Sequence, residues 1–348
     1  MEHLKTLEYK DGRLCILDQT RLPVQIQYLE IKTVDALINA IRLLKVRGAP
    51  AIGISAAYGL VLAAQSAPQT NHAAFFDALD YEANRLSASR PTAVNLFWAV
   101  RRMLQAARSR AREPISEIIR AMEAEARAIE QEDAAINRAI GENLLTLLWD
   151  GCTILTHCNA GILATSKYGT ALSPIYLAQE RGLHIRVFAD ETRPLLQGAR
   201  LTAFELMQIG ADVTLICDNM AASVMAQGLI DAVIVDCDRI AANGDTANKI
   251  GTLGLSILAK HFGIPMYIAA PTPTIDMDCS SGSHIPIEER DSMEIVCPGG
   301  IHTAPPNIKT YNPAFDVTPA DNLTAIITEN GIARPPFAQS LAALVGIK

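Results

Sequence analysis

The chain has 348 residues, of which 49% are hydrophobic and 19% are charged, and its formal net charge is −7. This composition is typical of a folded protein and argues against intrinsic disorder. The charge is spread along the chain without a stripe rich in Lys and Arg, so we expect no nucleic-acid partner. The length predicts two domains.

The cysteine count predicts a reducing environment. The chain has seven cysteines, an odd number, and none is arranged as a paired C-x-x-C, which is typical of reduced thiols. The N-terminal residues lack the basic and apolar pattern of a signal peptide. No uncharged apolar stretch of about 18 residues, the length of a membrane span, is expected. We therefore expect a cytoplasmic protein that has no membrane partner.

The N-terminal part of the chain is predicted to begin as a hairpin and to continue as helices. Residues 4–31 contain short apolar runs, and the Asp-Gly pair at residues 11–12 is typical of a two-residue hairpin turn. Between residues 33 and 148, Ala, Leu, Arg and Glu dominate and apolar residues recur at helical spacing. We expect a small, mostly helical domain over residues 1–128, with a long helix from near Ile115 connecting it to the next domain.

From Gly151 onward the pattern changes to short β-rich runs with helical segments between several of them. The runs are CTILTHC, HIRVFAD, DVTLIC, AVIVDCD, IPMYIAA and TAIIT, at residues 152–158, 184–190, 212–217, 232–238, 264–270 and 324–328. Alternating βα units of this spacing predict an α/β fold with a doubly wound parallel sheet. This second domain is expected over residues 129–348.

Polar residues at the ends of these runs predict where a site lies. In open α/β sheets, ligands bind outside the carboxyl ends of the strands. The polar segments that follow the runs are Thr156–Gly161, Asp190–Pro194, Cys217–Asn219, Asp236 with Asp238, and Pro271 with Thr272. Packing alone does not explain so many polar residues at one edge of an apolar sheet, so we expect the chemistry there.

Cys158 is the first catalytic candidate. It follows a strand and precedes an apparently helical segment, and a helix N-terminus lowers the pKa of a thiol. A buried, inert cysteine is the commoner alternative. His157 could act as a partner base, but neighbouring strand residues point to opposite faces, which favours a structural role for His157.

Asp238 is the stronger candidate. A carboxylate at the end of an apolar strand is costly to bury, and burial would raise its pKa toward the range of a general acid or base. A helix cap, a turn, or an ion pair with Arg239 or Lys249 would also account for it. Asp236 would share its face if the strand continued, and a role for one of these acids in supporting the other is an alternative to two separate roles.

Three further segments suggest contacts to a phosphorylated ligand. Two glycines, a proline and the cation Arg47 in the segment RGAPAIG favour phosphate at a helix N-terminus, although an ordinary helix entry has the same pattern. Arg90 is a second candidate or a solvated surface residue. Gln197 can donate and accept as a sugar hydroxyl requires, or can lie exposed on a helix. No dinucleotide or P-loop motif and no metal-ligand spacing occurs, so we expect no cofactor and no metal.

Six motifs in series resemble the methylthioribose-1-phosphate isomerase family, over about residues 5–332. They are RGAPAIG, SRPTAVN, THCNAG, ADETRPLLQGARLTAFEL, DRIAANGDTANKIGT and NPAFDVTP. The family belongs to a superfamily that also holds other pentose-phosphate isomerases and regulatory subunits of the initiation-factor-2B exchange factor. The resemblance implies a helical N-terminal domain, a Rossmann-like catalytic domain and a homodimer.

The resemblance also implies the activity and the site. The family is an intramolecular oxidoreductase that converts the aldose 5-methylthioribose 1-phosphate to 5-methylthioribulose 1-phosphate in methionine salvage. By motif, Cys158 and Asp238 are the catalytic residues. The implied substrate contacts are Arg47, Gly48, Ala49, Arg90, Gln197, Asn248 and Lys249. This chain departs from the family at Asp236-Cys237, where Gly-Ala is usual.

The implied substrate suggests roles for the two catalytic residues. A sugar phosphorylated on its anomeric oxygen cannot open spontaneously, so we expect a protonated Asp238 in a poorly hydrated pocket to donate to the ring oxygen. Cys158 would assist at C2, as a base or by stabilising charge, through either a cis-enediol or a hydride shift. Alternatives are 5-deoxyribose 1-phosphate, ribose 1,5-bisphosphate, or a non-catalytic sugar-phosphate sensor.

Overall fold

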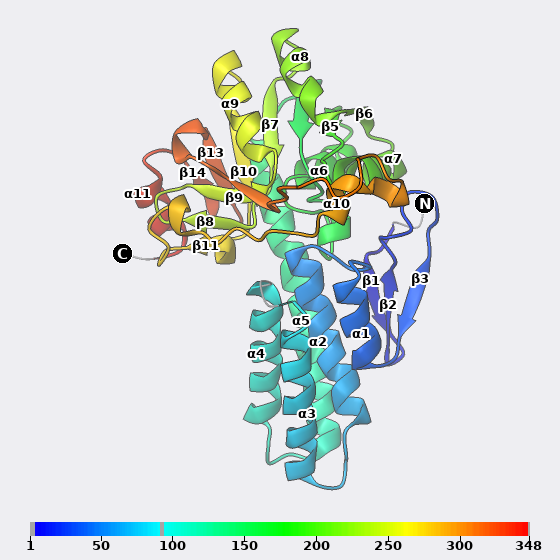
Figure 1. The fold of residues 1–348 in the computed structure, drawn as a ribbon. Helices are drawn as coiled ribbons and strands as arrows, with labels where there is room; N and C mark the ends of the chain where they lie inside the picture. Colours follow the sequence, from blue (N-terminus) through cyan, green and yellow to red (C-terminus); the bar gives the residue numbers. More distant parts are fainter. Residues whose placement is uncertain (1–3, 91–93, 347–348) are drawn as a thin grey trace. The chain divides into compact units, whose positions relative to one another are not determined.

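The computed structural model describes residues 4–90 and 94–346, which form two compact units (Figure 1). Unit 1 contains Met1–Ala135 and Ile162–Gly169, and unit 2 contains Ile136–Gly161 and Thr170–Lys348. The division falls within helix α5 (Ile115–Leu145), the long helix that the sequence predicted from near Ile115. The predicted boundary at residue 128 lies in the same helix. The return of the segment after Gly161 to unit 1 is a feature that the sequence pattern did not indicate.

Unit 1 begins with an antiparallel sheet of short strands. They are β1 (Leu7–Lys10), β2 (Arg13–Leu17) and β3 (Tyr28–Ile31), in that order. The turn between the first two consists of Asp11 and Gly12, both with positive φ, at 51° and 74°. A two-residue turn of this kind matches the twist of the strands and favours Asp-Gly, so the predicted hairpin is confirmed.

The rest of unit 1 is helical. Its helices are α1 (Val34–Arg42), α2 (Ala49–Ser66), α3 (His72–Ser87), α4 (Val94–Ser109) and the first part of α5. The side chains of Thr33 and Asn71 accept backbone N–H groups at the starts of α1 and α3, which satisfies donors that a helix end leaves open. Apolar faces of these helices meet in one core, whose largest buried side chains include Tyr58 and Phe75.

Helix α2 corrects one expectation. Among the described residues, it is the helix with the length and apolarity to cross a membrane, and it carries no charged residue over 18 positions. In the structure, 78% of those residues are buried inside the protein. A helix at the centre of a core must be apolar on all sides, so length and composition alone do not make α2 a membrane span.

Unit 2 is built on the predicted doubly wound sheet. In its described residues the strand order is β14 (Gly331–Ala333), β13 (Ala325–Thr328), β10 (Met266–Ala269), β7 (Ala232–Val235), β4 (Thr153–Thr156), β5 (Arg186–Asp190) and β6 (Asp212–Ile216). All neighbouring pairs are parallel except the edge pair of β13 with β14. Each predicted β-rich run supplies one parallel strand, and a mixed α/β fold is confirmed.

Helices connect the strands of this sheet. They are α6 (Ser173–Glu180), α7 (Ala203–Gln208), α8 (Ala221–Ala226), α9 (Thr252–Phe262) and α11 (Phe337–Leu344), with a short α10 (Met293–Val296) in the long connection before β12. A π-helical turn, Gly198–Thr202, precedes α7. Turns of this type are rare and are often found at functional sites.

A second, smaller sheet in unit 2 was not predicted. Its order is β11 (Ile275–Asp276), β8 (Arg239–Ala241), β9 (Thr246–Lys249) and β12 (Phe315–Thr318). Asn248 lies in β9, and helix α9 begins four residues later, at Thr252. Polar strands such as β9 have weak β propensity, so partners distant in sequence decide their structure.

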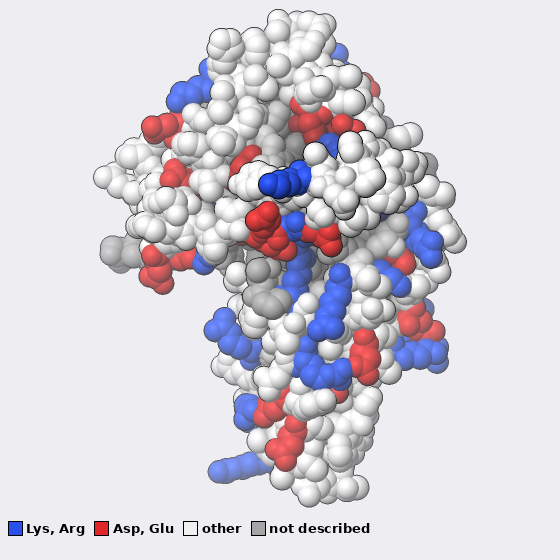
Figure 2. Space-filling view, viewed as in Figure 1, with Lys and Arg blue, Asp and Glu red and all other residues white. Residues whose placement is uncertain are grey.

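The charged surface of unit 1 is mixed in sign. Figure 2 shows blue Lys and Arg side chains interspersed with red Asp and Glu over its helices. Several form pairs along one helix, such as Arg127 with Glu123 at 2.8 Å. Exposed pairs of this kind each contribute about 0–1 kcal/mol, so the stability of unit 1 rests on its core.

We predict that Gly48→Ala destabilises the protein more than Gly151→Ala. Both glycines have a positive φ, +86° and +85°, so an alanine at either position pays a backbone penalty, and the ψ of 133° at Gly48 adds to it there. A Cβ at residue 48 would lie 2.5 Å from the backbone of Ala164, whereas no described atom lies within 4 Å of one at residue 151. We expect an additional loss of about 1–3 kcal/mol at residue 48 in urea unfolding. Equal losses would contradict the close approach of these two backbones.

Candidate active site

The strand order places a topological switch point between β4 and β7. From β4 the chain proceeds outward through β5 and β6, and it then returns to the other side of β4 to form β7, β10 and β13. Leu155 of β4 pairs in parallel with Val233 of β7. In doubly wound sheets, ligands bind at the carboxyl ends of strands at this point. Cys158 follows β4 and Asp238 follows β7, so the structure places both predicted catalytic residues after neighbouring strands.

Cys158 lies in a rigid, buried turn. It is 7% exposed and has a left-handed φ of 64°, which an L-residue adopts only when its surroundings impose it. Its N–H donates to Thr192 Oγ1 at 2.8 Å, and its carbonyl accepts from Thr202 Oγ1 at 2.6 Å. The helix expected directly after this turn starts later, because a 3₁₀ turn at Ile162–Ala164 comes first and α6 begins at Ser173. The prediction that a helix dipole acts directly on this thiol is therefore wrong.

A buried polar cluster supports the residues after Cys158. Asn159 Nδ2 donates to Glu205 Oε1 at 2.6 Å, and the Tyr176 hydroxyl donates to Glu205 Oε2 at 3.1 Å. Burial, together with the Glu205 carboxylate, raises the pKa of Tyr176 well above its usual value, which keeps this hydroxyl a donor. A Cβ at Gly161 would lie 1.9 Å from Glu205 Oε1. Sequence reasoning missed Glu205, although an acid within the apolar run of α7 was a signal for it.

Asp238 differs from its expected environment. Strand β7 ends at Val235, so the side-chain alternation that would have put Asp236 and Asp238 on one face stops before both. Asp236 is half-buried, Cys237 is buried and Asp238 is exposed, so the expected burial of Asp238 is wrong for this structure. The backbone N–H of Asp238 donates to the carbonyl of Ala247 in β9 at 2.9 Å. Burial, followed by the two flanking acids, raises the pKa of the Cys237 thiol well above its usual range, so Cys237 is a neutral thiol.

The cations near Asp238 have other partners. Arg239 forms an ion pair with Asp276 at 2.5 Å. Lys249 Nζ donates to the carbonyl of Ala314 at 3.2 Å and lies 4.5 Å from the centre of the Phe315 ring. These contacts hold the Lys249 ammonium beside β12, at the end of β9.

Gln197 and Lys249, two of the predicted substrate contacts, line one small pocket of unit 2. Its other lining residues are Pro194, Leu195, Arg290, Glu294, Asn312 and Ala314. Gln197 is 7% exposed, and its buried Oε1 has no hydrogen-bond partner among the described residues. A buried, unsatisfied amide oxygen is costly, and an exposed position on a helix is excluded for Gln197. Its acceptor is free for a ligand hydroxyl.

The remaining predicted contacts of unit 2 and unit 1 are also placed. Asn248 is buried, and its Nδ2 donates to Thr252 Oγ1 at 3.2 Å. Arg47, Gly48 and Ala49 lie at the N-terminal end of α2, with Gly48 as its N-cap and a proline in the first turn. This arrangement is the anion-binding type that the sequence suggested. Arg90 is half-buried, and the rest of its motif at residues 91–93 lies outside the described residues.

His157, Asp190 and Asp218 form a cluster with the residue types of a metal site. In the described chain, their ligating atoms lie within 4.8 Å of one another. Both oxygens of Asp218 already accept backbone N–H groups, from Thr192 and Arg193, each at 2.7 Å. Both ring nitrogens of His157 also have protein partners, so a metal would have to displace one of them to bind the ring.

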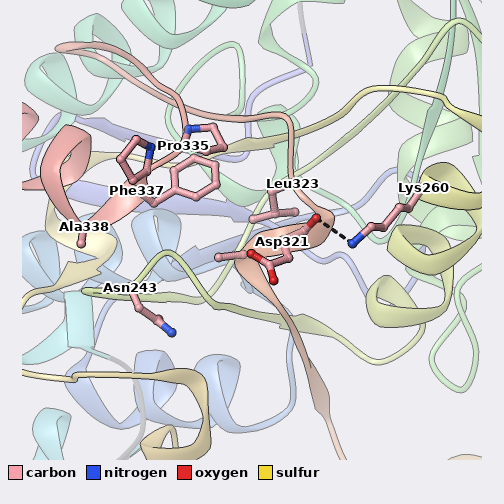
Figure 3. Close-up of a pocket in the computed structure, with 9 residues that line it drawn as sticks. Asn243, Lys260, Asp321, Leu323, Pro335, Phe337 and Ala338 are labelled. Carbon is pink, nitrogen blue, oxygen red and sulfur yellow. Dashed lines mark hydrogen bonds between the residues drawn. The ribbon is translucent and has the colours of Figure 1, made fainter.

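A larger cavity, of about 550 Å³, lies near the amino end of β13, opposite to the carboxyl ends of the strands (Figure 3). Asp321 and Leu323, before β13, and Phe337, after the antiparallel β14, line it together with Lys260, which donates to the Asp321 carbonyl at 3.0 Å. The catalytic candidates follow the carboxyl ends of parallel strands, whereas this cavity lies where β13 begins. Size alone therefore does not identify the active site here.

Comparison with known proteins identifies the family. The model of the initiation factor 2 subunit family matches residues 45–335. The chain belongs to this family. The match covers most of the chain, so the superfamily that the six motifs indicated is confirmed.

Relatives within this family are named as isomerases. A 5-deoxyribose 1-phosphate isomerase of Clostridium botulinum (strain Kyoto / Type A2) is 58% identical over 346 residues, which is 99% of each chain. An enzyme of the same name from Bacillus cereus is 55% identical over 343 residues, again 99% of each. The chain is therefore similar to isomerases over its full length.

Solved structures agree in fold. The 5-methylthioribose 1-phosphate isomerase of Pyrococcus horikoshii OT3 superposes with a TM-score of 0.96 at 43% identity, covering 100% of this chain and 97% of the other. A structure named as translation initiation factor eIF-2B, subunit delta, from A. fulgidus gives 0.92 at 44% identity, covering 99% of each. Together these relatives show that the chain is an enzyme, an isomerase of the sugar-phosphate class.

We predict that Gly198→Ala disrupts the site, whereas Gly254→Ala does not. A Cβ at residue 198 would lie 1.6 Å from the carbonyl oxygen of Asp190 and 2.9 Å from Thr192 Oγ1. The π-helical turn must shift to relieve this clash, and Gln197 shifts with it. We expect a loss of about 1–3 kcal/mol or more in thermal unfolding, together with lower turnover.

The control, Gly254→Ala, adds a Cβ to helix α9 with no described atom within 4 Å. Alanine favours helix over glycine by up to about 1 kcal/mol, so this variant should be at least as stable as the wild type. A Gly198→Ala protein that unfolds and turns over like the Gly254→Ala protein would contradict the close packing of the turn on β5.

Proposed function

We propose that the enzyme converts a 5-deoxypentose 1-phosphate from the cyclic aldose to the ketose, with 5-deoxyribose 1-phosphate as its first substrate. The observation that carries this proposal is the end-to-end identity of 55–58% with enzymes named for that reaction. 5-Methylthioribose 1-phosphate is the second candidate, because the 43% identical structure from Pyrococcus horikoshii carries that name. The two sugars differ only in the group on C5.

The proposed reaction requires an acid and a group that handles hydrogen at C2. A phosphate on the anomeric oxygen blocks spontaneous ring opening, so the bond from C1 to the ring oxygen must break with proton donation to that oxygen. We assign this donation to Asp238. Cys158 then assists the transfer of hydrogen from C2 to C1, and the product is the open ketose, with no change in overall redox state. Both residues follow neighbouring parallel strands, which supports their meeting at one pentose.

Anchoring of the substrate supplies orientation. We propose that the phosphate binds the backbone N–H groups at Gly48 and Ala49 with the help of Arg47 and Arg90, since a helix N-terminus with cations favours phosphate. Gln197, Asn248 and Lys249 would then contact the sugar hydroxyls. Fixing a reactant in this way can lower the barrier by about 7 kcal/mol at best.

Two alternatives receive less support. Ribose 1,5-bisphosphate would need a second cationic cluster. Arg290 lines the pocket beside Lys249, but it already pairs with Glu294 at 2.6 Å and with Glu288 at 3.8 Å. A non-catalytic sensor is suggested by the 44% identical structure named as an exchange-factor subunit. Turnover of either 5-deoxy sugar by the purified protein excludes that alternative.

We also propose a homodimer in the cytoplasm. All seven cysteines lie in the described residues and none forms a disulfide, which supports a reducing compartment. Strand β6 is an edge of the main sheet and exposes Leu215, and Met207 and Met220 nearby in sequence are also exposed. An edge strand with exposed apolar side chains is a surface that proteins usually cover.

Turnover of the methylthio sugar would place the enzyme in methionine salvage.

We predict that Cys158→Ser and Asp238→Asn each lower kcat by about 10²–10⁴-fold or more, because each removes a group that moves a proton in the transition state. The measurement is ketose formation from 5-deoxyribose 1-phosphate. Circular dichroism and thermal unfolding should show an intact fold for both variants.

Matched control variants make the same two chemical changes at residues outside the candidate site. Cys15→Ser replaces a thiol on β2 of unit 1, and Asp278→Asn replaces an exposed carboxylate after β11. Both should keep wild-type turnover. Wild-type rates in either catalytic variant, or equal losses in the controls, would remove the assignment of Cys158 and Asp238.

We predict that kcat/KM for 5-deoxyribose 1-phosphate exceeds that for 5-methylthioribose 1-phosphate by about tenfold or more. A pocket shaped for a methyl group excludes a larger methylthio group by about 10–200-fold, as is typical of small differences in apolar size. The measurement is a side-by-side assay of the two sugars with the same enzyme preparation. A higher kcat/KM for the methylthio sugar would reverse the order of the two candidates.

A further inference from the structure

A histidine beside the catalytic cysteine is buried among acids. His157 is 2% exposed, and its two ring nitrogens each have one partner. Nδ1 lies 2.9 Å from Asp190 Oδ2, at the end of β5. Nε2 lies 2.9 Å from the carbonyl oxygen of Ile250, between β9 and α9. One side chain thus connects three segments that are distant in sequence.

The two partners determine how many protons the ring shares. A carbonyl oxygen only accepts, so Nε2 must carry a proton. A neutral ring would then turn a bare Nδ1 lone pair toward the Asp190 carboxylate at 2.9 Å, which is repulsive unless a second proton lies between them. Asp190 is 1% exposed, and its other oxygen has no hydrogen-bond partner among the described residues. The pair therefore holds one proton more than a neutral histidine alone would hold.

The surrounding charges favour that proton on the ring. Asp190 and Asp218 face His157, and Asp316 on β12 interacts with it electrostatically. Backbone N–H groups satisfy Asp218 and Asp316, but each of these carboxylates adds negative potential. Burial lowers the pKa of His157, but the hydrogen bond and charge of Asp190, together with Asp218, outweigh burial and raise it. Burial raises the pKa of Asp190 as well, but the hydrogen bond and charge of His157 oppose that shift, so we place the shared proton on the ring and treat His157 as an imidazolium opposite a carboxylate.

The imidazolium holds the turn that follows β9. Gly251 has a φ of +107°, and a Cβ there would lie 2.9 Å from His157 Cε1 and Nε2, so the ring packs directly on this turn. Asp316 accepts the N–H of Gly251 at 2.8 Å from the other strand. Thr252 Oγ1 donates to the Lys249 carbonyl at 2.7 Å and accepts from Asn248. The last two residues of β9 are therefore tied to a turn that His157 holds.

We propose that His157 is a positioning residue for the isomerase reaction, in which its imidazolium holds the Ile250 carbonyl and so fixes Asn248 and Lys249 relative to Cys158. This inference rests on the proposed function of those residues. Stability does not explain the pair, since a buried ion pair is often no more stable than apolar residues of similar volume. The pair contributes to the geometry of the site, because Cys158 is the next residue in the chain. The His157 ring thus joins the turn of Cys158 to the end of β9, where Asn248 and Lys249 lie.

The test uses two amide variants that keep different bonds. In His157→Gln, the longer side chain places an amide N–H near the Nε2 position and can still donate to Ile250. In His157→Asn, the shorter amide reaches only the Nδ1 position beside Asp190. We expect KM for 5-deoxyribose 1-phosphate to rise by roughly tenfold or more in the Asn variant, with a smaller change in kcat, since a hydrogen bond from a charged group is lost. The Gln variant should recover most of that loss.

A second readout needs no variant to fold well. In ¹⁵N NMR of the whole protein, both ring nitrogens of His157 should still carry a proton at a pH just above 6.5, where a free imidazole has begun to lose one. The free energy of unfolding should depend on pH in the corresponding direction. A histidine whose pKa is raised in the folded state stabilises the protein fully below about pH 6.5, and this stabilisation is lost as the pH rises through the folded-state pKa. The stability advantage of the wild type over His157→Gln should therefore shrink as pH rises above 6.5.

Several results would overturn the proposal. A neutral His157 ring in an active wild-type enzyme would do so, as would two variants that unfold earlier to the same extent with unchanged KM. Loss of wild-type turnover in EDTA, restored by Mg²⁺ or Zn²⁺, would make the cluster a metal site instead. Absence of wild-type turnover on both sugars would overturn the proposed function together with this role.

Discussion

Leu155 of β4 pairs in parallel with Val233 of β7, and this pairing determines which two strand ends meet at the switch point of the sheet. Neighbouring strands lie about 4.8 Å apart, so the segments that follow them start within reach of one small ligand. Cys158 and Asp238 stand in those segments. If a strand other than β7 lay on this side of β4, Asp238 would start farther from Cys158, whatever its chemistry.

The carboxyl edge also explains why so many polar groups are tolerated next to an apolar sheet. Several of these groups satisfy a backbone atom of a neighbouring strand end: Thr192 accepts from Cys158, Asp218 accepts from the turn after β5, and Asp316 accepts from the turn before α9. Buried polar groups are stable only when such bonds are complete. Gln197 Oε1 and Asp190 Oδ1 are two of the buried oxygens that have no hydrogen-bond partner among the described residues. Gln197 lines the small pocket, and Asp190 pairs with His157 through its other oxygen, so both residues belong to the candidate site.

Sequence patterns predicted the parts of this fold that depend on local chemistry. The Asp-Gly turn required positive φ at two residues, and the β-rich runs had the length and composition of buried parallel strands. The strand ends therefore indicated the edge at which the candidate site lies. The β8–β9 hairpin was missed because both strands are short, β9 is polar, and the pair depends on β11 and β12 for further partners. The left-handed turn at Cys158 was missed because tertiary packing alone imposes it. The buried Glu205, which contacts Asn159, was missed although its place in the apolar run of α7 was a signal.

Strand β9 connects the two halves of the candidate chemistry. The N–H of Asp238 donates to Ala247 at its centre, and the Ile250 carbonyl beyond its end accepts from His157. Between these two bonds lie Asn248 and Lys249. A displacement of β9 would move the proposed acid and the proposed sugar contacts together, whereas the turn of Cys158 is held separately by two threonines. The backbone of Asp238 is thus bonded to β9, which is itself held at its end by His157. The backbone at the site can therefore be ordered although the Asp238 carboxylate is exposed to solvent.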